Sequence, residues 1–321
     1  MPTTKRAGRR KPRSRADANR RQPVSRWDAL RRGGIQVVQW AALAKLPRIV
    51  HGFSTRPGGE STRDGNHVLN LGFAEWDERS RVTANRARFL RALGAQQMKL
   101  VALRQVHSDL IHRVDKQPEH APRGDAAMTR TPGLLLAVQT ADCVPVLLAD
   151  TRRRAVATIH AGWRGTLKRI VAKTVGRMQM EFGTRPRDVV AALGPCIGRC
   201  CYEVGPEVVQ AFASQFEKAS EWFAATDSGP HGKMATFDSL AWGEGPNPLK
   251  WLWMTPPGHD PPPPRLKLDL VAANRRQLLD AGVPEGNISA SGECTACNTQ
   301  RYFSYRREGP TGRMLSVIGV K

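Results

Sequence analysis

Residues 134–165 read LLLAVQTADCVPVLLADTRRRAVATIHAGWRG. Three short apolar runs in this segment, at 134–138, 144–149 and 155–159, are typical of buried β-strands. The glycine-containing turn at 160–165 precedes apolar residues at helical spacing on one face, namely Leu167, Ile170, Val171, Thr174, Val175, Met178 and Phe182. The segment therefore predicts a strand, a tight turn and a helix in succession, which is a mixed α and β pattern.

The same alternation continues towards the C-terminus. A strand is predicted at 189–193, a helix opens at Pro206, and another helix is capped by Asp269 and stopped by Gly282. The last predicted strands are 287–291, 302–306 and 314–320, and a turn at 308–312 joins the final two as a hairpin. A chain of 321 residues is long enough for one large domain or two smaller ones.

Composition excludes several classes of protein. With 40% hydrophobic and 24% charged residues and no run near eighteen apolar residues, the chain is expected to be globular and soluble, without a membrane span. The formal net charge is +22, and residues 1–34 hold twelve basic and two acidic residues with little apolar periodicity. We interpret 1–34 as a disordered basic arm, either a dispensable extension, which we favour, or a nucleic-acid contact. No apolar segment of a secretory signal follows these charges, so we expect a cytoplasmic protein.

Two further features stand apart from the predicted elements. Residues 226–264 are rich in proline and glycine, which favours a surface insertion or linker. The six cysteines are too few and too clustered for a disulfide framework, so reduced thiols or metal ligands are expected. Cys294 and Cys297 have C-x-x-C spacing, but Cys196 with the pair Cys200-Cys201 does not supply a second such motif, so a structural zinc is not predicted there.

The strongest candidate for chemistry is a set of three residues at strand ends. His107 ends the run 101–107, Cys143 lies between two predicted strands, and His160 ends a third. Two imidazoles and a thiolate suit zinc, and three protein ligands leave one position for water or substrate. The alternative is structural, with His107 a hydrogen-bonded core histidine and Cys143 a small buried hydrophobe.

The turn after His160 is a candidate anion site. Gly162, Arg164 and Gly165 place flexible backbone and a guanidinium at a predicted helix start, where unpaired N–H groups attract phosphate. The alternative is a plain strand-to-helix turn whose arginine faces water.

A longer resemblance emerges from motifs that run in order across residues 48–320. The chain resembles the YfiH-type family, also called the laccase-domain or multicopper polyphenol-oxidase family. The matching segments include Gly52-Phe-Ser-Thr-Arg-Pro-Gly-Gly59, Leu69-Asn-Leu-Gly72, Arg104-Gln-Val-His107, Thr140-Ala-Asp-Cys-Val-Pro-Val146, His160-Ala-Gly-Trp-Arg-Gly165, Leu193-Gly-Pro-Cys-Ile-Gly198, Cys201-Tyr-Glu-Val-Gly205 and Phe303-Ser-Tyr-Arg-Arg307.

The resemblance implies a fold and a site. It implies an α+β fold in which a single domain, 35–321, combines mixed β-sheets with flanking helices. It also implies a catalytic zinc on His107, Cys143 and His160. The residues that it implies around the same pocket are Arg56, Asn70, Gln105, Asp142, Arg164, Phe303 and Ser304.

The activity that the resemblance implies is purine nucleoside phosphorylase. Its expected substrates are phosphate with adenosine, inosine or methylthioadenosine, and a zinc-dependent adenosine deaminase activity is expected at the same site. Arg164 and Arg56 would neutralise phosphate, and the metal would activate water to displace the amino group at C6 of adenine. Asp142 would either protonate the departing purine or orient a ligand histidine.

Three rival functions remain. The family is also described as a peptidoglycan editing factor, so a zinc-dependent amidase acting on precursors that contain L-Ser is the main alternative. A multicopper oxidase is disfavoured because the chain has only eight histidines, and Cu²⁺ is expected only as a substitute for Zn²⁺. A nucleic-acid-binding protein would act through the basic arm. The sequence leaves open whether the protein is a monomer or a homo-oligomer.

Overall fold

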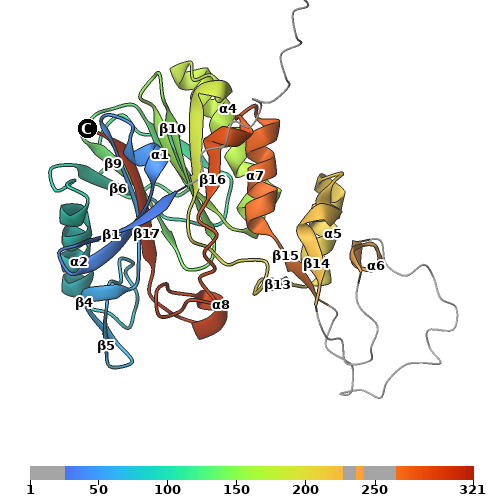
Figure 1. Cartoon of the computed structure of the whole chain (residues 1–321), viewed down its shortest axis with the longest axis horizontal. Helices are drawn as coiled ribbons and strands as arrows, with labels where there is room; N and C mark the ends of the chain where they lie inside the picture. Colours follow the sequence, from blue (N-terminus) through green and yellow to red (C-terminus); the bar gives the residue numbers. More distant parts are fainter. Residues whose placement is uncertain (1–25, 227–235, 242–264) are drawn as a thin grey trace, which may run out of the picture.

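Two six-stranded mixed sheets pack face to face in this protein, which we describe from a computed structural model over residues 26–226, 236–241 and 265–321 (Figure 1). In spatial order, the strands of the first sheet are β1 (Trp27–Arg32), β2 (Ile35–Trp40), β3 (Ile49–Ser54), β17 (Met314–Val320), β9 (Leu134–Thr140) and β6 (Lys99–Ala102). Those of the second sheet are β16 (Ile288–Ala290), β12 (Val189–Leu193), β10 (Val144–Asp150), β11 (Val156–Ala161), β8 (Ala126–Thr129) and β7 (Ile111–Arg113). The pairs β6–β9, β7–β8 and β12–β16 are parallel and the others are antiparallel.

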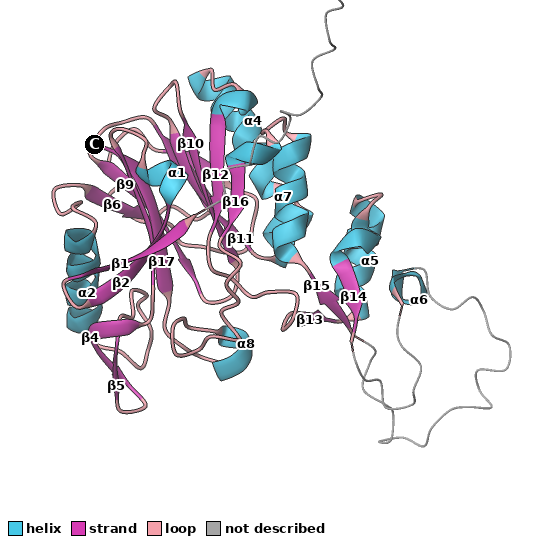
Figure 2. Ribbon diagram, viewed as in Figure 1, coloured by secondary structure: helices cyan, strands magenta, loops and turns pink. Residues whose placement is uncertain are grey.

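Helices cover the outer face of each sheet. Helix α2 (Arg79–Ala92) lies on the first sheet, and α4 (Ile170–Phe182) and α7 (Leu270–Asp280) lie on the second (Figure 2). The central strands are consequently buried on both faces. Along β9, Leu136 packs towards Leu147 of β10 in the opposite sheet, while Leu135 faces Phe89 of α2. This double burial explains why the central strands are continuous apolar runs rather than alternating ones.

The remaining elements form two smaller sheets and several short helices. The small strands are β4 (Pro57–Arg63) with β5 (Asn66–Val68), and β13 (Glu203–Val204), β15 (Leu266–Leu268) and β14 (Phe223–Ala225). The other α-helices are α1 (Ala41–Ala44), α3 (Trp163–Leu167), α5 (Pro206–Gln215), α6 (Phe237–Ala241) and α8 (Tyr305–Glu308). Together these elements confirm the predicted single domain with mixed sheets and flanking helices.

Several details differ from the sequence-based expectations. The helix predicted after residue 165 is broken into α3 and α4, because Arg169 adopts a left-handed conformation with φ 61°. The Arg169 guanidinium donates to the carbonyl of Gln215 and stacks over the ring of Phe216, which anchors the break.

The predicted strand at 302–306, and with it the C-terminal hairpin, is wrong. Ser304 caps α8 instead, because its hydroxyl accepts a hydrogen bond from the backbone N–H of Arg307. Strand β17 pairs with β3 and β9, so its partners come from distant parts of the sequence.

The predicted boundary of the basic arm at residue 34 is also wrong. Residues 27–32 form β1, which pairs along its whole length with β2, and the Trp27 ring packs 5.5 Å from that of Phe53. A deletion that tests the arm must therefore stop before Arg26. Two predicted segments lie largely outside the described residues: the rest of the arm, 1–25, and most of the insertion predicted at 226–264. Within the insertion, α6 is described, and its Phe237 packs against Phe223 of β14.

None of the helices in the described part of the chain combines the length and the hydropathy that crossing a bilayer requires.

Candidate functional site

His107, Cys143 and His160 meet where the two large sheets end. The chain leaves the first sheet after β9 and enters the second at β10, and Cys143 lies at this crossing. His107 follows β6 of the first sheet, while His160 belongs to β11 of the second. Ligand atoms of all three side chains lie within 4.8 Å of one another, and Cys143 Sγ is 3.8 Å from His107 Nε2. Three residues spread over 54 positions of sequence thus form one cluster.

A buried carboxylate, Asp125, positions both histidines. Asp125 Oδ1 lies 2.8 Å from His160 Nδ1 and accepts the backbone N–H of His107 at 3.0 Å. Its other oxygen accepts hydrogen bonds from the backbone N–H and the hydroxyl of Ser108. Because Nδ1 of His160 is engaged in this way, Nε2 is left for the cluster. Carboxylate contacts of this kind are typical of metal-ligating histidines.

Asp125 was not predicted from the sequence, and Asp142 was the carboxylate expected in this role. The available signal was an acidic residue at the start of the apolar strand β8, where Asp125 is completely buried. Such a residue requires several hydrogen-bond donors. The hydrogen bond to His160 is made by Asp125, not Asp142.

Electrostatics at the cluster favour the thiolate of Cys143. Burial alone would raise the pKa of this thiol, but the charge of His160 and hydrogen bonds from both histidines outweigh burial and lower it. Burial alone would likewise lower the pKa of His160, but the charge of Cys143 and the contact with Asp125 raise it. For Asp125, burial is outweighed by hydrogen bonds from His160 and Ser108, which hold the pKa of this carboxyl well below its usual range. The thiolate is the form of cysteine that binds metals.

Gly162 leaves room for the cluster at the start of the turn. A Cβ atom at this position would lie 2.9 Å from Cys143 Sγ and 3.1 Å from His107 Cδ2. Any side chain larger than hydrogen would therefore push against two of the three residues. The glycine in His160-Ala-Gly-Trp-Arg-Gly165 is explained by this close approach.

Asp142 stands beside Cys143 in a constrained conformation. Its φ is 97°, a value that side-chain-bearing residues rarely adopt. Its Oδ1 accepts a hydrogen bond of 2.7 Å from the hydroxyl of Thr295, and Oδ2 accepts one of 2.6 Å from the backbone N–H of Arg306. Asp142 thereby joins the loop that carries Cys143 to two C-terminal segments.

The cluster lies in a cavity of about 590 Å³, a volume typical of small-molecule sites. Gln105, Asp142 and Arg164 of the predicted residues line it with the three clustered residues. The other basic lining residues are Arg104, Arg306 and Arg313, and the aromatic ones are Trp163, Tyr202 and Tyr305. The cavity thus offers positive charge and flat apolar rings beside a potential metal site.

Gln105 and Arg164 have defined positions in this cavity. The Gln105 side chain makes two hydrogen bonds of 2.7 Å with the backbone of Gln139, which tie the segment after β6 to β9. The Arg164 guanidinium lies 4.4 Å from the centre of the Trp163 ring, in the first turn of α3. Arg164 therefore combines charge and stacking at one side of the cavity.

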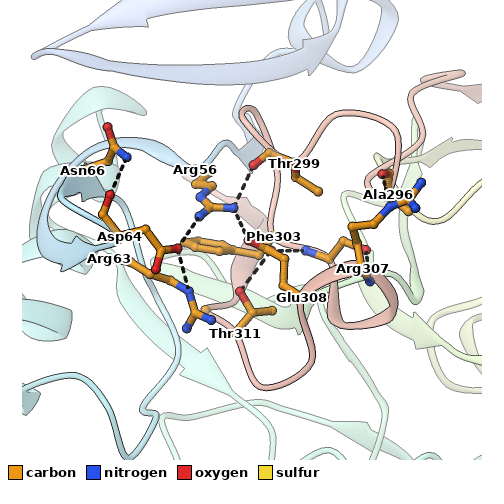
Figure 3. Close-up of polar contacts among 12 residues, drawn as sticks. Arg56, Arg63, Asp64, Asn66, Ala296, Thr299, Phe303, Arg307, Glu308 and Thr311 are labelled. Atoms are coloured by element: carbon orange, nitrogen blue, oxygen red, sulfur yellow. Dashed lines mark hydrogen bonds and ion pairs between the residues drawn. The ribbon is translucent and has the colours of Figure 1, made fainter.

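The other four predicted residues do not line this cavity. The Arg56 guanidinium is held by Glu308 at 2.6 Å and by the carbonyl of Thr299 at 2.8 Å, above the ring of Phe303 (Figure 3). Arg56 borders a separate hollow with Asp64.

Asn70, Phe303 and Ser304 are completely buried and support the structure around them. The Asn70 amide donates to the carbonyl of Gly72, and the Ser304 hydroxyl caps α8. None of these three side chains lines the cavity.

The donor set of the cluster fits a divalent transition metal. Two imidazole nitrogens and one thiolate are ligands of zinc in catalytic sites and are also accepted by copper. In the contact of His160 with Asp125, the ring nitrogen that points away from the cluster meets a carboxylate, as is usual for histidines that bind metals. Among the described residues, this is the one metal-capable cluster that contains histidine.

Comparisons with known proteins agree on one family. A family model described as multi-copper polyphenol oxidoreductase laccase matches residues 50–240 and 254–321. A protein of Deinococcus radiodurans named purine nucleoside phosphorylase is 37% identical over 284 residues, covering 87% of this chain and 92% of its own. Adenosine deaminase RL5, from an unknown prokaryotic organism, is 34% identical over 285 residues, covering 86% and 95%.

Solved structures give the same result. The crystal structure of YlmD from Geobacillus stearothermophilus matches with a TM-score of 0.73 and 31% identity, covering 91% of this chain and 98% of that one. The YfiH protein of Bacillus licheniformis matches with a TM-score of 0.72 and 30% identity. The chain therefore belongs to the YfiH-like family whose model is described as multi-copper polyphenol oxidoreductase laccase.

Proposed function

We propose that this chain is a purine nucleoside phosphorylase. It would cleave adenosine, inosine and methylthioadenosine with phosphate to the base and the ribose 1-phosphate, and would also deaminate adenosine in the same pocket. The observation that carries the proposal is that His107, Cys143 and His160 share one cavity with several arginines and aromatic rings. The printed names of the relatives, purine nucleoside phosphorylase and adenosine deaminase, support both activities.

His107, Cys143 and His160 would hold the metal, which we infer to be zinc. When bound, zinc would act as a Lewis acid and lower the pKa of a coordinated water. Asp125 keeps His160 oriented for this role, and the His107 loop is fixed by the same carboxylate. Copper would enter the same ligand set only as a substitute, because Cu²⁺ generally outcompetes Zn²⁺ at nitrogen and sulfur ligands.

Aromatic side chains would bind the purine. Trp163, Tyr202 and Tyr305 line the cavity, and flat rings of this kind stack on nucleobases. Burial is the main cause that raises the pKa of the Tyr202 phenol, so this side chain stays a neutral hydrogen-bond donor. The purine would therefore lie between rings, with its sugar towards the arginines.

Arg164 would hold the phosphate beside the ribose. Its guanidinium can donate two parallel hydrogen bonds to phosphate oxygens, and its stacking on Trp163 restricts its orientation. Arg306 and Arg313 add positive charge to the same cavity. Arg56 is excluded from our proposal as a phosphate ligand, because it is paired with Glu308 outside this cavity.

We assign proton transfer to the departing purine to Asp142. It is the one carboxylic acid among the described residues that line the cavity. The competing role is positioning, since its oxygens accept hydrogen bonds from Thr295 and Arg306.

Asp142→Asn should abolish base release while zinc stays bound, measured by product analysis and elemental analysis. Base release at the wild-type rate would leave Asp142 only a positioning role.

The most direct test of the function is product identification from adenosine and phosphate. Wild-type protein should yield adenine and ribose 1-phosphate together with inosine, measured by chromatography and mass spectrometry. His107→Ala should lose these products because it removes one of three metal ligands. His112→Ala is the matched control and should keep them, since His112 contacts the carbonyl of Arg123 away from the cluster.

Other outcomes of this assay contradict the proposal. Metal-loaded wild-type protein that makes no product from any purine nucleoside would refute it. Release of L-Ser from a peptidoglycan precursor by the same protein would establish the amidase alternative instead.

Phosphate binding predicts a selective effect of Arg164→Ala. The KM for phosphate should rise about 10- to 100-fold, because hydrogen bonds to charged groups contribute about 1.5–3 kcal/mol. Deamination of adenosine, which needs no phosphate, should keep its rate within a few-fold. Lys168→Ala removes a neighbouring cation that pairs with Asp109 outside the cavity, and should leave both activities unchanged. Equal losses in both activities of Arg164→Ala would contradict a role in phosphate binding.

Asp125 predicts an effect on metal affinity. Asp125→Asn keeps the shape of the side chain but weakens the contact with His160, so zinc affinity should fall about 10- to 100-fold. Competition with a chromophoric chelator measures this affinity. Asp109→Asn serves as the control because Asp109 pairs with Lys173 on the surface. An unchanged zinc affinity in Asp125→Asn would show that the carboxylate does not support the metal ligands.

A further inference from the structure

Four cysteines form a second cluster that the proposed reaction does not use. They are Cys200, Cys201, Cys294 and Cys297, and their sulfur atoms all lie within 4.8 Å of one another. Cys297 Sγ is 3.5 Å from the sulfur of Cys200 and 3.4 Å from that of Cys201. None of His107, Cys143 and His160 belongs to this second cluster.

The fold brings these cysteines together from two distant loops. One loop follows β12 and the other follows β16, and these two strands are parallel neighbours in the second sheet. The loops stay side by side beyond the strands, because Cys196 and Cys294 form a parallel bridge and the Thr295 N–H donates to the carbonyl of Cys196. The cysteine spacing did not predict this four-cysteine cluster, because one loop supplies a C-x-x-C pair and the other supplies two adjacent cysteines.

The sulfur separations exclude disulfides in this structure and match a single metal ion. A disulfide requires about 2.05 Å between sulfur atoms, far less than the distances observed. Four thiolates at about 2.3 Å from a tetrahedral zinc are separated by about 3.8 Å along each edge, close to the distances found here. A multinuclear cluster would spread its thiolates over several metal atoms, whereas the four sulfur atoms here all lie within 4.8 Å of one another.

We propose that Cys200, Cys201, Cys294 and Cys297 bind a structural zinc ion. The four thiolates would close the coordination shell, so this ion would have no open position for substrate. It would cross-link the two loops beyond the backbone contacts at Cys196, Cys294 and Thr295.

Neighbouring groups suit a thiolate-bound cation. The backbone N–H of Gly198 donates to Cys294 Sγ at 3.2 Å, and such contacts stabilise thiolate ligands. The Arg307 guanidinium lies 4.0 Å from Cys201 Sγ and offsets the negative charge of four thiolates on a divalent ion. Gly198 also leaves space, because a Cβ atom there would lie 3.2 Å from Cys200 Sγ and from Cys294 Cβ.

The proposed ion would fix one wall of the active-site cavity. Tyr202, which follows Cys201 directly, lines the cavity. Thr295, between the two cysteines of the C-x-x-C pair, donates to Asp142. The zinc would therefore position both a stacking ring and the carboxylate beside Cys143 without taking part in the reaction.

Zinc content of the full-length chain tests this proposal. Wild-type protein purified without chelators and dialysed against metal-free buffer should contain two zinc ions per chain by elemental analysis. Cys297→Ser should contain one fewer, and His107→Ala should retain the ion on the four cysteines. Cys196→Ala is the matched control and should keep the wild-type content, because Cys196 is a buried thiol outside the cluster.

The result does not depend on the active-site metal. Zinc that persists in His107→Ala and disappears in Cys297→Ser supports the four-cysteine site even if no nucleoside activity is found. Zinc that is absent from His107→Ala, or unchanged in Cys297→Ser, overturns it.

Thiol reactivity gives a second readout that requires no cysteine variant. Cys200 and Cys297 are exposed, so without a metal ion both sulfur atoms would be accessible to a thiol reagent. Bound to zinc, they should react slowly until a strong chelator is added. Rapid reaction of the wild-type protein before chelation would refute the proposal, as would a mass lower by two hydrogen atoms, which indicates a disulfide.

Discussion

The candidate site depends on the hydrogen bonds made by the buried carboxylate of Asp125. This carboxylate accepts hydrogen bonds from the loop that carries His107 and contacts His160 on a strand of the second sheet. A completely buried charge of this kind is stable only when several donors surround it, so the loop and the strand must keep their relative positions. The geometry of the metal-capable cluster is thus determined by a residue outside it.

The stacking of the two large sheets supplies the second constraint. Because β9 and β10 belong to different sheets, the connection between them must cross the interface at their ends. Asp142 and Cys143 lie on this short crossing, and Asp142 adopts a positive φ there. The cavity lies at the same edge, with charged and aromatic side chains from both halves of the fold.

Sequence patterns predicted the elements that are dominated by local burial and missed those set by distant contacts. The buried strands around residues 134–159 and the helix capped by Asp269 were correct, since apolar runs and a capping residue are local signals. The strand expected at 302–306 was wrong because the Ser304 cap directs a helical turn. Asp125 and the four-cysteine cluster were missed because their partners lie far away in sequence, and neither strand pairing nor loop proximity can be read from spacing alone. Similarly, the motif that contains Arg56 marks a supporting ion pair, which sequence could not distinguish from a substrate contact.

Anomalous diffraction at the zinc absorption edge, from crystals grown with a purine nucleoside and phosphate, tests the central claim most directly. The account predicts a zinc peak between His107, Cys143 and His160, with the base stacked near Trp163 and Tyr202 and phosphate against Arg164. A cluster without a metal peak in zinc-loaded crystals, or a nucleoside bound only outside this cavity, would contradict it.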